Sequence, residues 1–244
     1  MFQQAIENYV KSHGYSSINL KAVFFDMDGV LFNSMPNHAR SWHKIMDEFG
    51  FNLTEEEAYM HEGRTGAGTI NILSRRERGR DATEEEIQAI YHAKTVEFNK
   101  LPEAKRMPGA LEVLQQIKSN GITPTIVTGS GQKSLIERIN RNFPEIFDPS
   151  LMVTAFDVKI GKPNPEPYLM ALKKTGLKPN EALVVENAPL GVQAGVAAGI
   201  FTIAVNTGPL PDHVLLDEGA NLLFPSMNRF NESWETLRNE LDNK

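Results

Sequence analysis

From residue 107 to the C-terminus, short apolar runs alternate with segments of helical periodicity. The runs that we expect to be strands span 122–127, 151–154, 183–185 and 201–205, and the helices between and after them span 133–140, 166–174 and 192–198. Another apolar run, Val23 to Phe25, precedes them. Strands joined by helices are typical of a parallel sheet with helices on both faces. We therefore predict an α/β protein built on a doubly wound parallel sheet.

The segment between the first strand and this alternating part has a different pattern. Residues 36–105 are charged and helical in periodicity, and they contain no convincing strand. Thr83 is placed to cap a helix that opens with three glutamates. One helical stripe carries the large apolar side chains Trp42, Ile45, Met46 and Phe49.

These patterns divide the chain into three parts. Residues 18–35 and 106–244 are predicted to form a Rossmann-like α/β core. Residues 36–105 are predicted to form an all-helical cap inserted into that core. Residues 1–17 form an N-terminal extension, because residues 2–12 have the apolar spacing of a short helix.

Composition argues against several classes of protein. The 244 residues include 25 basic and 31 acidic side chains, with a net charge of -6, so binding to nucleic acid or to an anionic membrane has no electrostatic support. No apolar stretch reaches the roughly 18 to 20 residues of a membrane span, and there is no cysteine for disulfides. We therefore expect a cytoplasmic, monomeric protein whose partner is a small molecule.

The first strand ends in two carboxylates one residue apart, Asp26 and Asp28, followed by Gly29. Acids and glycine are common where a strand breaks into a turn, so the pair is explained equally well by a structural role. In an open α/β sheet, however, ligands bind outside the carboxyl ends of the strands, where this strand delivers both acids. One carboxylate can then attack an electrophile or hold a cation while the other exchanges protons.

Polar residues also follow two later strands. Thr128, Gly129 and Ser130 come after 122–127, and a hydroxyl with the amides of small residues before a helix suits a phosphoryl oxygen. Glu186-Asn187 comes after 183–185 and supplies oxygen ligands of the kind that Mg²⁺ binds. An ordinary turn before a helix is the alternative explanation of each segment.

A lysine lies in a loop of restricted backbone. Residues 159–167 hold Lys162 among three prolines, which is more order than a solubilising lysine needs. The alternative is a proline-rich loop that closes onto the start of a helix and has no chemical role.

The order of these segments is more specific than any one of them. Asp-x-Asp-Gly, Thr-Gly-Ser, Lys-Pro and Glu-Asn follow one another along the core. In this order they resemble the haloacid dehalogenase superfamily of phosphotransferases, over essentially the whole chain after residue 18. Phe25 to Leu31, Lys162-Pro163 and Val185 to Gly195 are most similar to the β-phosphoglucomutase-like branch, in which a helical cap follows the first motif.

The resemblance implies phosphoryl transfer through an aspartyl-phosphate. Asp26 would be the nucleophile, and Asp28 would protonate the leaving oxygen and then activate the acceptor, usually water. Mg²⁺ would be held by the Asp26 carboxylate, the main-chain carbonyl of Asp28 and the pair Glu186-Asn187.

The same resemblance assigns the phosphoryl group its other partners. Thr128 would donate a hydrogen bond to it, with Gly129 and Ser130 beside it. Lys162 would neutralise charge on the phosphoryl group and on Asp26. These roles agree with the physics of phosphoryl transfer, in which catalysis is mostly positioning and charge stabilisation.

The chain departs from the family pattern in two places. Relatives usually have an acid where Asn187 stands, and sugar-phosphate mutases present a lysine and an arginine from the cap where this chain has Glu62 and Gly66. Arg64 partly restores a cation there. We interpret the departures together: Glu62 reaches the metal when the cap closes and supplies the charge that Asn187 lacks, which leaves room for a compact leaving group. A solvated acid at a helix end is the alternative reading of Glu62.

Two more residues are candidates for the leaving group. His38 and Lys94 could contact a leaving phosphate, although surface positions explain them as well. The sequence thus predicts a Mg²⁺-dependent phosphohydrolase acting on inorganic pyrophosphate, as in the pyrophosphatase-like members of this branch, or on a sugar phosphate. A phosphosugar mutase is one alternative, and a non-catalytic module that binds a phosphorylated metabolite is another.

Overall fold

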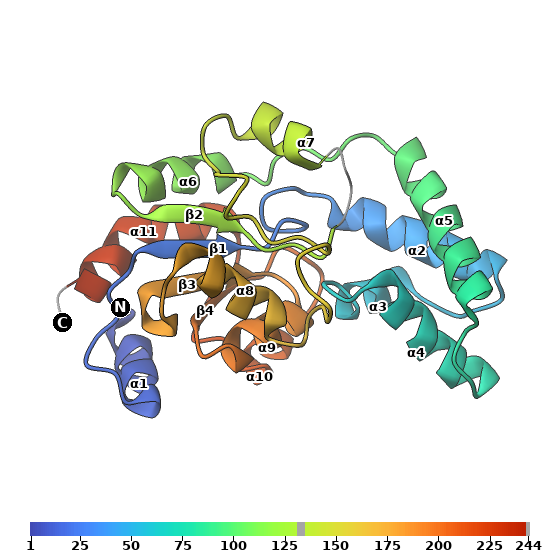
Figure 1. The fold of residues 1–244 in the computed structure, drawn as a ribbon, viewed down its shortest axis with the longest axis horizontal. Helices are drawn as coiled ribbons and strands as arrows, with labels where there is room; N and C mark the ends of the chain where they lie inside the picture. The colour runs from blue at the N-terminus through green and yellow to red at the C-terminus, as the bar shows by residue number, and fades with distance from the viewer. Residues whose placement is uncertain (131–134, 243–244) are drawn as a thin grey trace.

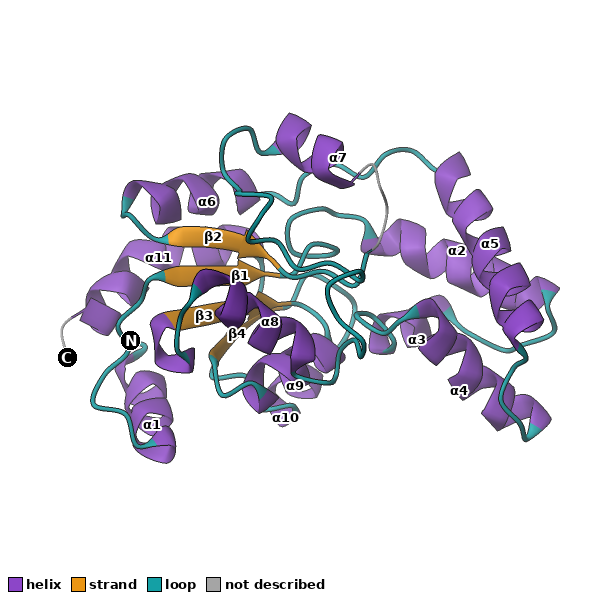
Figure 2. Ribbon diagram, viewed as in Figure 1, coloured by secondary structure: helices purple, strands orange, loops and turns teal. Residues whose placement is uncertain are grey.

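The computed structural model describes residues 1–130 and 135–242. Five parallel strands form one sheet in the order β2-β1-β3-β4-β5. Figure 2 shows the first four of them in this order. The strands are β1 (Ala22–Phe25), β2 (Thr123–Ile126), β3 (Ala182–Glu186), β4 (Phe201–Val205) and β5 (Leu222–Phe224). Phe25 of β1 is level with Ile126 on one side and Val185 on the other, so the first three strands end together.

Alternate residues of each strand pack against opposite layers of helices. Val23 and Phe25 belong to a core shared with α1, α6, α7 and α11, whereas Ala22 and Phe24 pack with α8 and α9. Figure 1 shows α8, α9 and α10 together on one side of the strands. The elements are α1 (Gln3–His13), α6 (Ala110–Ser119), α7 (Leu135–Asn142), α8 (Glu166–Thr175), η1 (Pro179–Glu181), α9 (Pro189–Ala197), α10 (Asp212–Asp217) and α11 (Met227–Asp242).

Four helices, which we call the helical unit, lie beyond the carboxyl ends of the strands (Figure 1). They are α2 (Met35–Glu48), α3 (Glu55–Met60), α4 (Gly66–Arg78) and α5 (Glu84–Lys100). Ile45, Met46, Leu73 and Ile90 are among the residues of a hydrophobic core that belongs to this unit. Thr83 caps α5 as predicted, in a capping box with Glu86.

The predicted fold class is confirmed, with corrections in detail. Residues 151–154 are not a strand of the sheet, because Val153 makes only one isolated bridge, to Val127. The predicted helix start at residue 133 lies outside the described residues. The structure adds α6, α10, α11 and the edge strand β5, which were not predicted. The division of the chain at residues 35 and 106 stays a prediction.

The first helix packs on the core. Ile6 and Tyr9 of α1 are buried, and the Tyr9 hydroxyl donates to the carbonyl of Gly199 at 2.8 Å. Within the described part of the chain, every helix is too short or too polar to span a membrane.

Candidate active site

The polar residues that follow β1, β2 and β3 meet at one end of the sheet, facing the helical unit. Those after β1 and β2 line a cavity of about 130 Å³ together with residues of α2, α4 and α5 and of the turn that precedes α4. Every candidate for substrate contact that the sequence indicated is on the wall of this cavity: His38, Arg64, Lys94, Gly129 and Ser130. Asp26, Asp28, Thr128 and Glu62 line it as well.

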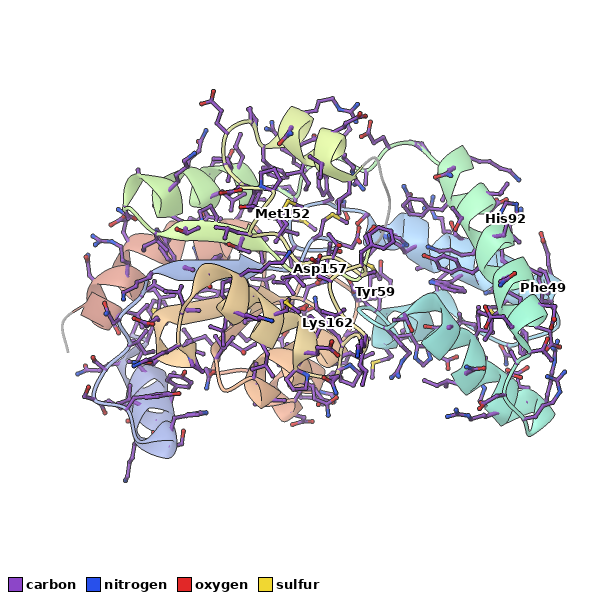
Figure 3. The ribbon with its side chains drawn as sticks, viewed as in Figure 1. Phe49, Tyr59, His92, Met152, Asp157 and Lys162 are labelled. Carbon is purple, nitrogen blue, oxygen red and sulfur yellow. The ribbon has the colours of Figure 1, made fainter. Side chains whose placement is uncertain are left out.

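Lys162 joins two buried carboxylates of neighbouring strands. Its Nζ lies 2.5 Å from Asp26 Oδ1 and 2.6 Å from Glu186 Oε1, and it donates to the Val127 carbonyl at 3.1 Å. Burial opposes a charged lysine, but these two carboxylates raise the pKa of Lys162 above its usual value. Figure 3 labels Lys162 at the end of the sheet that faces the helical unit, and a Cβ at Gly63 would stand 3.2 Å from Lys162 Cδ. Lys162 is therefore a permanent cation beside Asp26.

Asp26 is a carboxylate whose surroundings oppose its ionisation. Burial raises its pKa to about 7, Lys162 opposes this rise, and the nearby Glu186 and Asp28 carboxylates add to it. Its position follows from the sheet, since the Asp26 N–H donates to the carbonyl of Val185 at 3.0 Å as the last bond of the strand ladder. Added positive charge would favour the ionised form.

Asp28 has the opposite environment. Its Oδ1 accepts from the Ser34 hydroxyl at 2.5 Å and lies 3.5 Å from His38 Nε2. Burial alone would raise the pKa of Asp28, but His38, Ser34 and Arg138 together hold it well below its usual range. The surroundings thus shift the pKa values of Asp26 and Asp28 in opposite directions. Such a difference is a recurrent way to give two neighbouring carboxylates different roles.

His38 and Lys94 are both part of the site, in contrast to the surface alternative. Lys94 is buried, and its Nζ lies 2.8 Å from His38 Nδ1. The His38 ring stacks on Phe98, and Lys94 Nζ lies over the Trp42 and Phe98 rings at 5.3 and 4.8 Å. Burial lowers the pKa of Lys94 to about 8, and burial and Lys94 lower that of His38.

The segment after β2 presents a free hydroxyl hydrogen. The Ser130 N–H donates to Thr128 Oγ1 at 3.1 Å, so the hydroxyl of Thr128 uses an acceptor lone pair and keeps its hydrogen for another group. Thr128 is buried and its N–H is held by the Val153 carbonyl at 2.9 Å. The backbone thus directs a donor to the cavity that Asp26 lines.

Glu62 of the helical unit reaches the core. Asn187 Nδ2 donates to both Glu62 carboxylate oxygens at 3.0 Å, and Glu62 is only 9% exposed. The alternative reading of Glu62 as a solvated acid is therefore wrong. Burial, and then Asp26, raise the pKa of Glu62 well above its usual value. A Cβ at Gly29 would stand 2.0 Å from Asn187 Nδ2, and Gly29 has φ +83°, so this approach requires a glycine.

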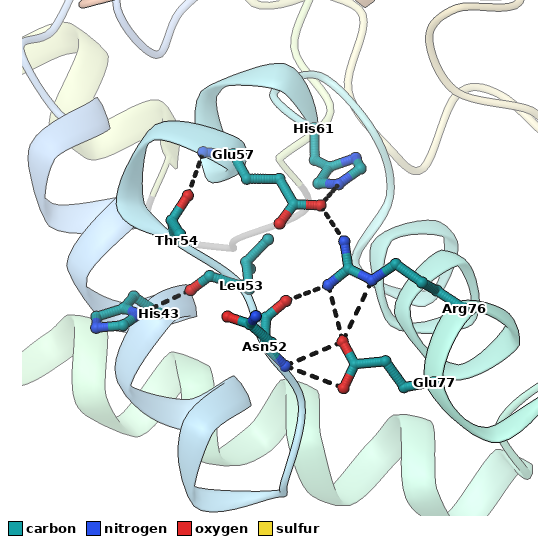
Figure 4. Close-up of polar contacts among 8 residues, drawn as sticks. All are labelled: His43, Asn52, Leu53, Thr54, Glu57, His61, Arg76 and Glu77. Atoms are coloured by element: carbon teal, nitrogen blue, oxygen red, sulfur yellow. Dashed lines mark hydrogen bonds and ion pairs between the residues drawn. The ribbon is translucent and has the colours of Figure 1, made fainter.

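A network on α3 and α4 fixes the turn that carries Glu62 (Figure 4). Thr54 Oγ1 caps α3 by accepting from the Glu57 N–H at 3.0 Å. Glu57 pairs with Arg76 of α4 and lies 3.5 Å from His61 Nε2. His61 directly precedes Glu62, so the contacts of Glu57 with His61 and Arg76 help to fix the position of the turn that carries Glu62.

The residues around Asp26 fit a divalent cation. Within the described ranges, no three His, Asp or Glu side chains are arranged to hold a metal ion by themselves. However, Asn187 Oδ1 is buried and accepts no hydrogen bond from any described residue. The carboxylates that raise the pKa of Glu62 are Asp26, Glu186 and Asp28. An unused amide oxygen beside an excess of carboxylates is a donor set suited to Mg²⁺.

Lys94 allows a prediction about stability. Its pKa of about 8, against a usual 10.5, means that burying the ammonium costs about 3 kcal/mol. The folded pKa is the lower one, so this cost is complete below pH 8 and disappears as the pH rises from 8 to 10.5. We expect Lys94→Met to raise the free energy of unfolding by about 1–3 kcal/mol at pH 7 and by almost nothing at pH 10.5. Chemical denaturation of both proteins at the two pH values measures it, and an equal gain at both would contradict it.

Several site residues were not found from the sequence. Tyr168 donates to Glu186 Oε1 at 2.7 Å, Ser34 holds Asp28, and Thr207 Oγ1 donates to the Gly29 carbonyl at 2.7 Å. Arg138 of α7 also lines the cavity. Of these, Ser34 gave the clearest signal in the sequence, because a serine directly before a helix with a proline in its first turn is a common N-cap residue.

Comparisons with known proteins agree with this geometry. The family model described as haloacid dehalogenase-like hydrolase matches residues 23–205. Hexitol phosphatase A of Escherichia coli is 34% identical over 76% of this chain and 83% of its own length. The phosphorylated carbohydrates phosphatase of Thermotoga maritima is 32% identical over 82% of this chain and 92% of its own.

A solved structure is much more similar. It is described as "Putative beta-phosphoglucomutase from Bacteroides vulgatus", is 75% identical, and superimposes with a TM-score of 0.97 over 99% of this chain and 98% of its own. The match of the family model to most of the chain, and the identity to curated phosphatases over most of their length, show the family. The chain therefore belongs to the haloacid dehalogenase-like hydrolases and is an enzyme that acts on phosphate esters.

Proposed function

We propose that this chain is a Mg²⁺-dependent phosphohydrolase that acts through an aspartyl-phosphate on Asp26, with inorganic pyrophosphate as its substrate. The contact between Glu62 and Asn187 carries the proposal, because it brings a carboxylate of the helical unit beside the phosphoryl site. In this role the helical unit is the cap of the enzyme, and the contact corresponds to its closed position.

The first half of the reaction transfers the phosphoryl group to the enzyme. An Asp26 carboxylate oxygen attacks phosphorus, and the bond from phosphorus to the leaving oxygen breaks. Lys162, 2.5 Å from Asp26 Oδ1, holds the carboxylate in place and stabilises the charge on the phosphoryl oxygens. Thr128 donates its free hydroxyl hydrogen to the same oxygens. His38, Ser34 and Arg138 hold the pKa of Asp28 low in the free protein, so Asp28 becomes protonated only when the anionic substrate offsets these groups, and it then gives its proton to the leaving oxygen.

The second half returns the enzyme to its starting state. Asp28 accepts a proton from a water molecule, and the water oxygen attacks phosphorus of the aspartyl-phosphate. The bond between phosphorus and the Asp26 oxygen breaks, which releases phosphate and the free carboxylate. Ser34 and His38 hold Asp28 at 2.5 and 3.5 Å and so orient its carboxyl group for both proton transfers.

The candidate metal ligands are the Asp26 carboxylate, the Asp28 carbonyl, Glu186, Asn187 and Glu62. When bound, Mg²⁺ would supply positive charge that keeps Asp26 ionised and balances the phosphoryl oxygens. Asn187 has an unused, buried Oδ1 for this purpose. Glu62 supplies the negative charge that an aspartate in place of Asn187 would have given.

The size and charge of the cavity favour a compact substrate. With Glu62 in place, the cavity measures about 130 Å³, and the cations Lys94 and Arg64 are both part of its wall. A leaving phosphate carries negative charge that these cations can bind, whereas a neutral sugar hydroxyl does not use them. His38 would contact the same group.

The relatives supply the competing candidates. Hexitol phosphatase A and the phosphorylated carbohydrates phosphatase are phosphatases of carbohydrates by name, so a sugar phosphate is the second candidate substrate. The description of the 75% identical structure favours a phosphosugar mutase. A mutase must bind the distal phosphate of a sugar bisphosphate, and Glu62 opposes that charge.

A substrate panel separates these candidates. We expect phosphate release from pyrophosphate with a kcat/KM at least about tenfold above that for hexitol phosphates and hexose phosphates, corresponding to about 1.4 kcal/mol, and only with Mg²⁺ present. Steady-state phosphate assays, with EDTA as the control, measure this ratio. Conversion of a hexose 1-phosphate into its 6-phosphate without phosphate release would establish the mutase instead.

A further inference from the structure

Arg138 is a guanidinium at the site with two unused donors. It lies on α7 and lines the cavity together with Asp28, His38 and Lys94. Its Nε and Nη2 are shielded from water and have no acceptor among the described residues. Leaving charged donors without an acceptor costs more than the roughly 1–3 kcal/mol of a neutral group. An arginine in this state is prepared for an acceptor that the described part of the protein does not supply.

The guanidinium is held by an aromatic surface. The Arg138 Cζ lies 3.9 Å from the centroid of the Phe32 ring, and Phe32 is fully buried and packs edge-on against Phe143 at 5.4 Å. Stacking on a rigid ring fixes the plane of the guanidinium and leaves its N–H edge for hydrogen bonds. The free donors therefore have a defined orientation.

The two free nitrogens are those that grip an anion side-on. In the same protein, Arg75 uses its Nε and Nη2 to bind both oxygens of Asp81. The same edge of Arg138 is free of described acceptors, and its geometry matches two oxygens of a carboxylate or phosphate. By contrast, Arg141, one turn further along α7, already pairs with Glu103.

Positive charge gathers around Arg138. Both Arg138 and Lys94 lower the pKa of His38 by repulsion, so the three groups lie near one another. The carboxylate that faces them is Asp28, which already bonds Ser34 and His38. The opposite end of the cavity has an excess of carboxylates, around Glu62. Among the described residues, the cavity is therefore negative around Glu62, where a cation would bind. It is positive around His38, where Lys94 and Arg138 lie.

We propose that Arg138 binds an anionic group on the leaving half of the substrate through Nε and Nη2, so that the substrate is a phosphoryl compound with a second anionic group. The inference rests on the proposed function, since it takes Asp26 as the acceptor of the phosphoryl group. Arg138 belongs to the core, whereas Lys94 belongs to α5 of the helical unit, and both lie near His38. An anion held between them joins the two parts, so such a substrate favours the closed position.

The experiment compares two substrates that differ in the second charge. Pyrophosphate has an anionic leaving group, and phenyl phosphate has an uncharged one. We expect Arg138→Gln to raise KM for pyrophosphate about 10- to 150-fold, which is the loss of a charged hydrogen-bond pair worth about 1.5–3 kcal/mol, and to change KM for phenyl phosphate by less than about twofold. Arg138→Lys keeps the charge without the planar fork and should give an intermediate KM. Arg141→Gln is the matched control on the same helix and should leave KM unchanged for both substrates.

A binding measurement separates this inference from the proposed function. Methylenediphosphonate is not hydrolysed, and calorimetry gives its Kd for wild type and for Arg138→Gln in the presence of Mg²⁺. A Kd that rises at least about tenfold in the variant supports the role of Arg138 even if wild type turns over neither substrate, which would refute only the proposed function. An unchanged Kd, or equal losses on pyrophosphate and phenyl phosphate, would overturn the role of Arg138. Circular dichroism and melting curves of the three variants show whether they are folded.

Discussion

Asp26→Asn is expected to lower kcat for every phosphorylated substrate by about 10⁴-fold or more. The carboxylate oxygen that would form the bond to phosphorus is lost, and removal of a nucleophile from a catalytic group of this kind has effects on the order of 10⁴ to 10⁶. The amide oxygen that the substitution introduces can still accept from Lys162, so the site keeps its shape. Phosphate release under saturating substrate measures the effect.

Loss of activity in this variant should come without loss of the fold, because two effects on its stability oppose each other. Burial raises the pKa of Asp26 to about 7, and the unfolded value is near 3.8, so the folded protein penalises the ionised form above pH 7. Asp26→Asn removes that penalty, but it also takes away one of the two carboxylates that raise the pKa of the buried Lys162. In metal-free buffer at pH 8, Asp26→Asn should therefore melt within about 4 °C of wild type. The exposed Asp217 gives the control Asp217→Asn, which should alter neither activity nor melting. A variant at position 26 that retains more than about a hundredth of the wild-type kcat would rule out Asp26 as the nucleophile.

Most of the sheet was predictable because each of these strands has a recognisable apolar run in the sequence. Val23 to Phe25 and Phe201 to Val205 are continuous, largely apolar runs, as expected of strands covered on both faces. The edge strand β5 was missed because it has only three residues, two of them half-buried, and so gives a weak signal. The run at 151–154 was overestimated: its one bridge, from Val153 to Val127, extends the edge beyond the end of β2 without forming a ladder.

The core of the site was also predictable, whereas its supporting contacts were not. Asp26, Thr128, Lys162 and Glu186 each lie at the end of a strand or in a restricted loop, and parallel strands bring their carboxyl ends together by construction. Phe98 lies one turn from Lys94 on α5, but Trp42 is far from Lys94 in sequence and reaches it only through the packing of α2 on α5. No local pattern encodes such a contact.

The role of Arg138 at the site was likewise not predictable from the sequence. Its helix carries several charged residues, and sequence spacing does not distinguish Arg138 from Arg141, which pairs with Glu103 at the surface. The distinction arises from Phe32, which lies before α2 and meets the guanidinium in space. The electrostatic division of the cavity into a negative and a positive end is thus a property of the tertiary fold.

The pair Glu62 and Asn187 gives the second large effect. Glu62→Gln removes a charge from the proposed metal set, and we expect the Mg²⁺ concentration for half-maximal pyrophosphatase activity to rise about 10- to 100-fold. Asn187→Asp places a carboxylate oxygen where Nδ2 now stands, 3.0 Å from the Glu62 oxygens, and repulsion replaces two hydrogen bonds. This single variant should therefore lose activity through a cap that closes less well.

The double variant Glu62→Gln with Asn187→Asp exchanges the two groups and keeps the total charge. The amide introduced at position 62 can donate to the carboxylate introduced at position 187, so the contact is rebuilt with its polarity reversed. We expect its Mg²⁺ requirement to return to within about threefold of wild type, which amounts to a coupling energy of about 1 kcal/mol or more between the two positions. Glu55→Gln removes the same charge from an exposed position of α3 and is the control. If the effects of the two single changes simply add in the double variant, Glu62 and Asn187 do not share a metal ion, and the closed cap has no part in binding it.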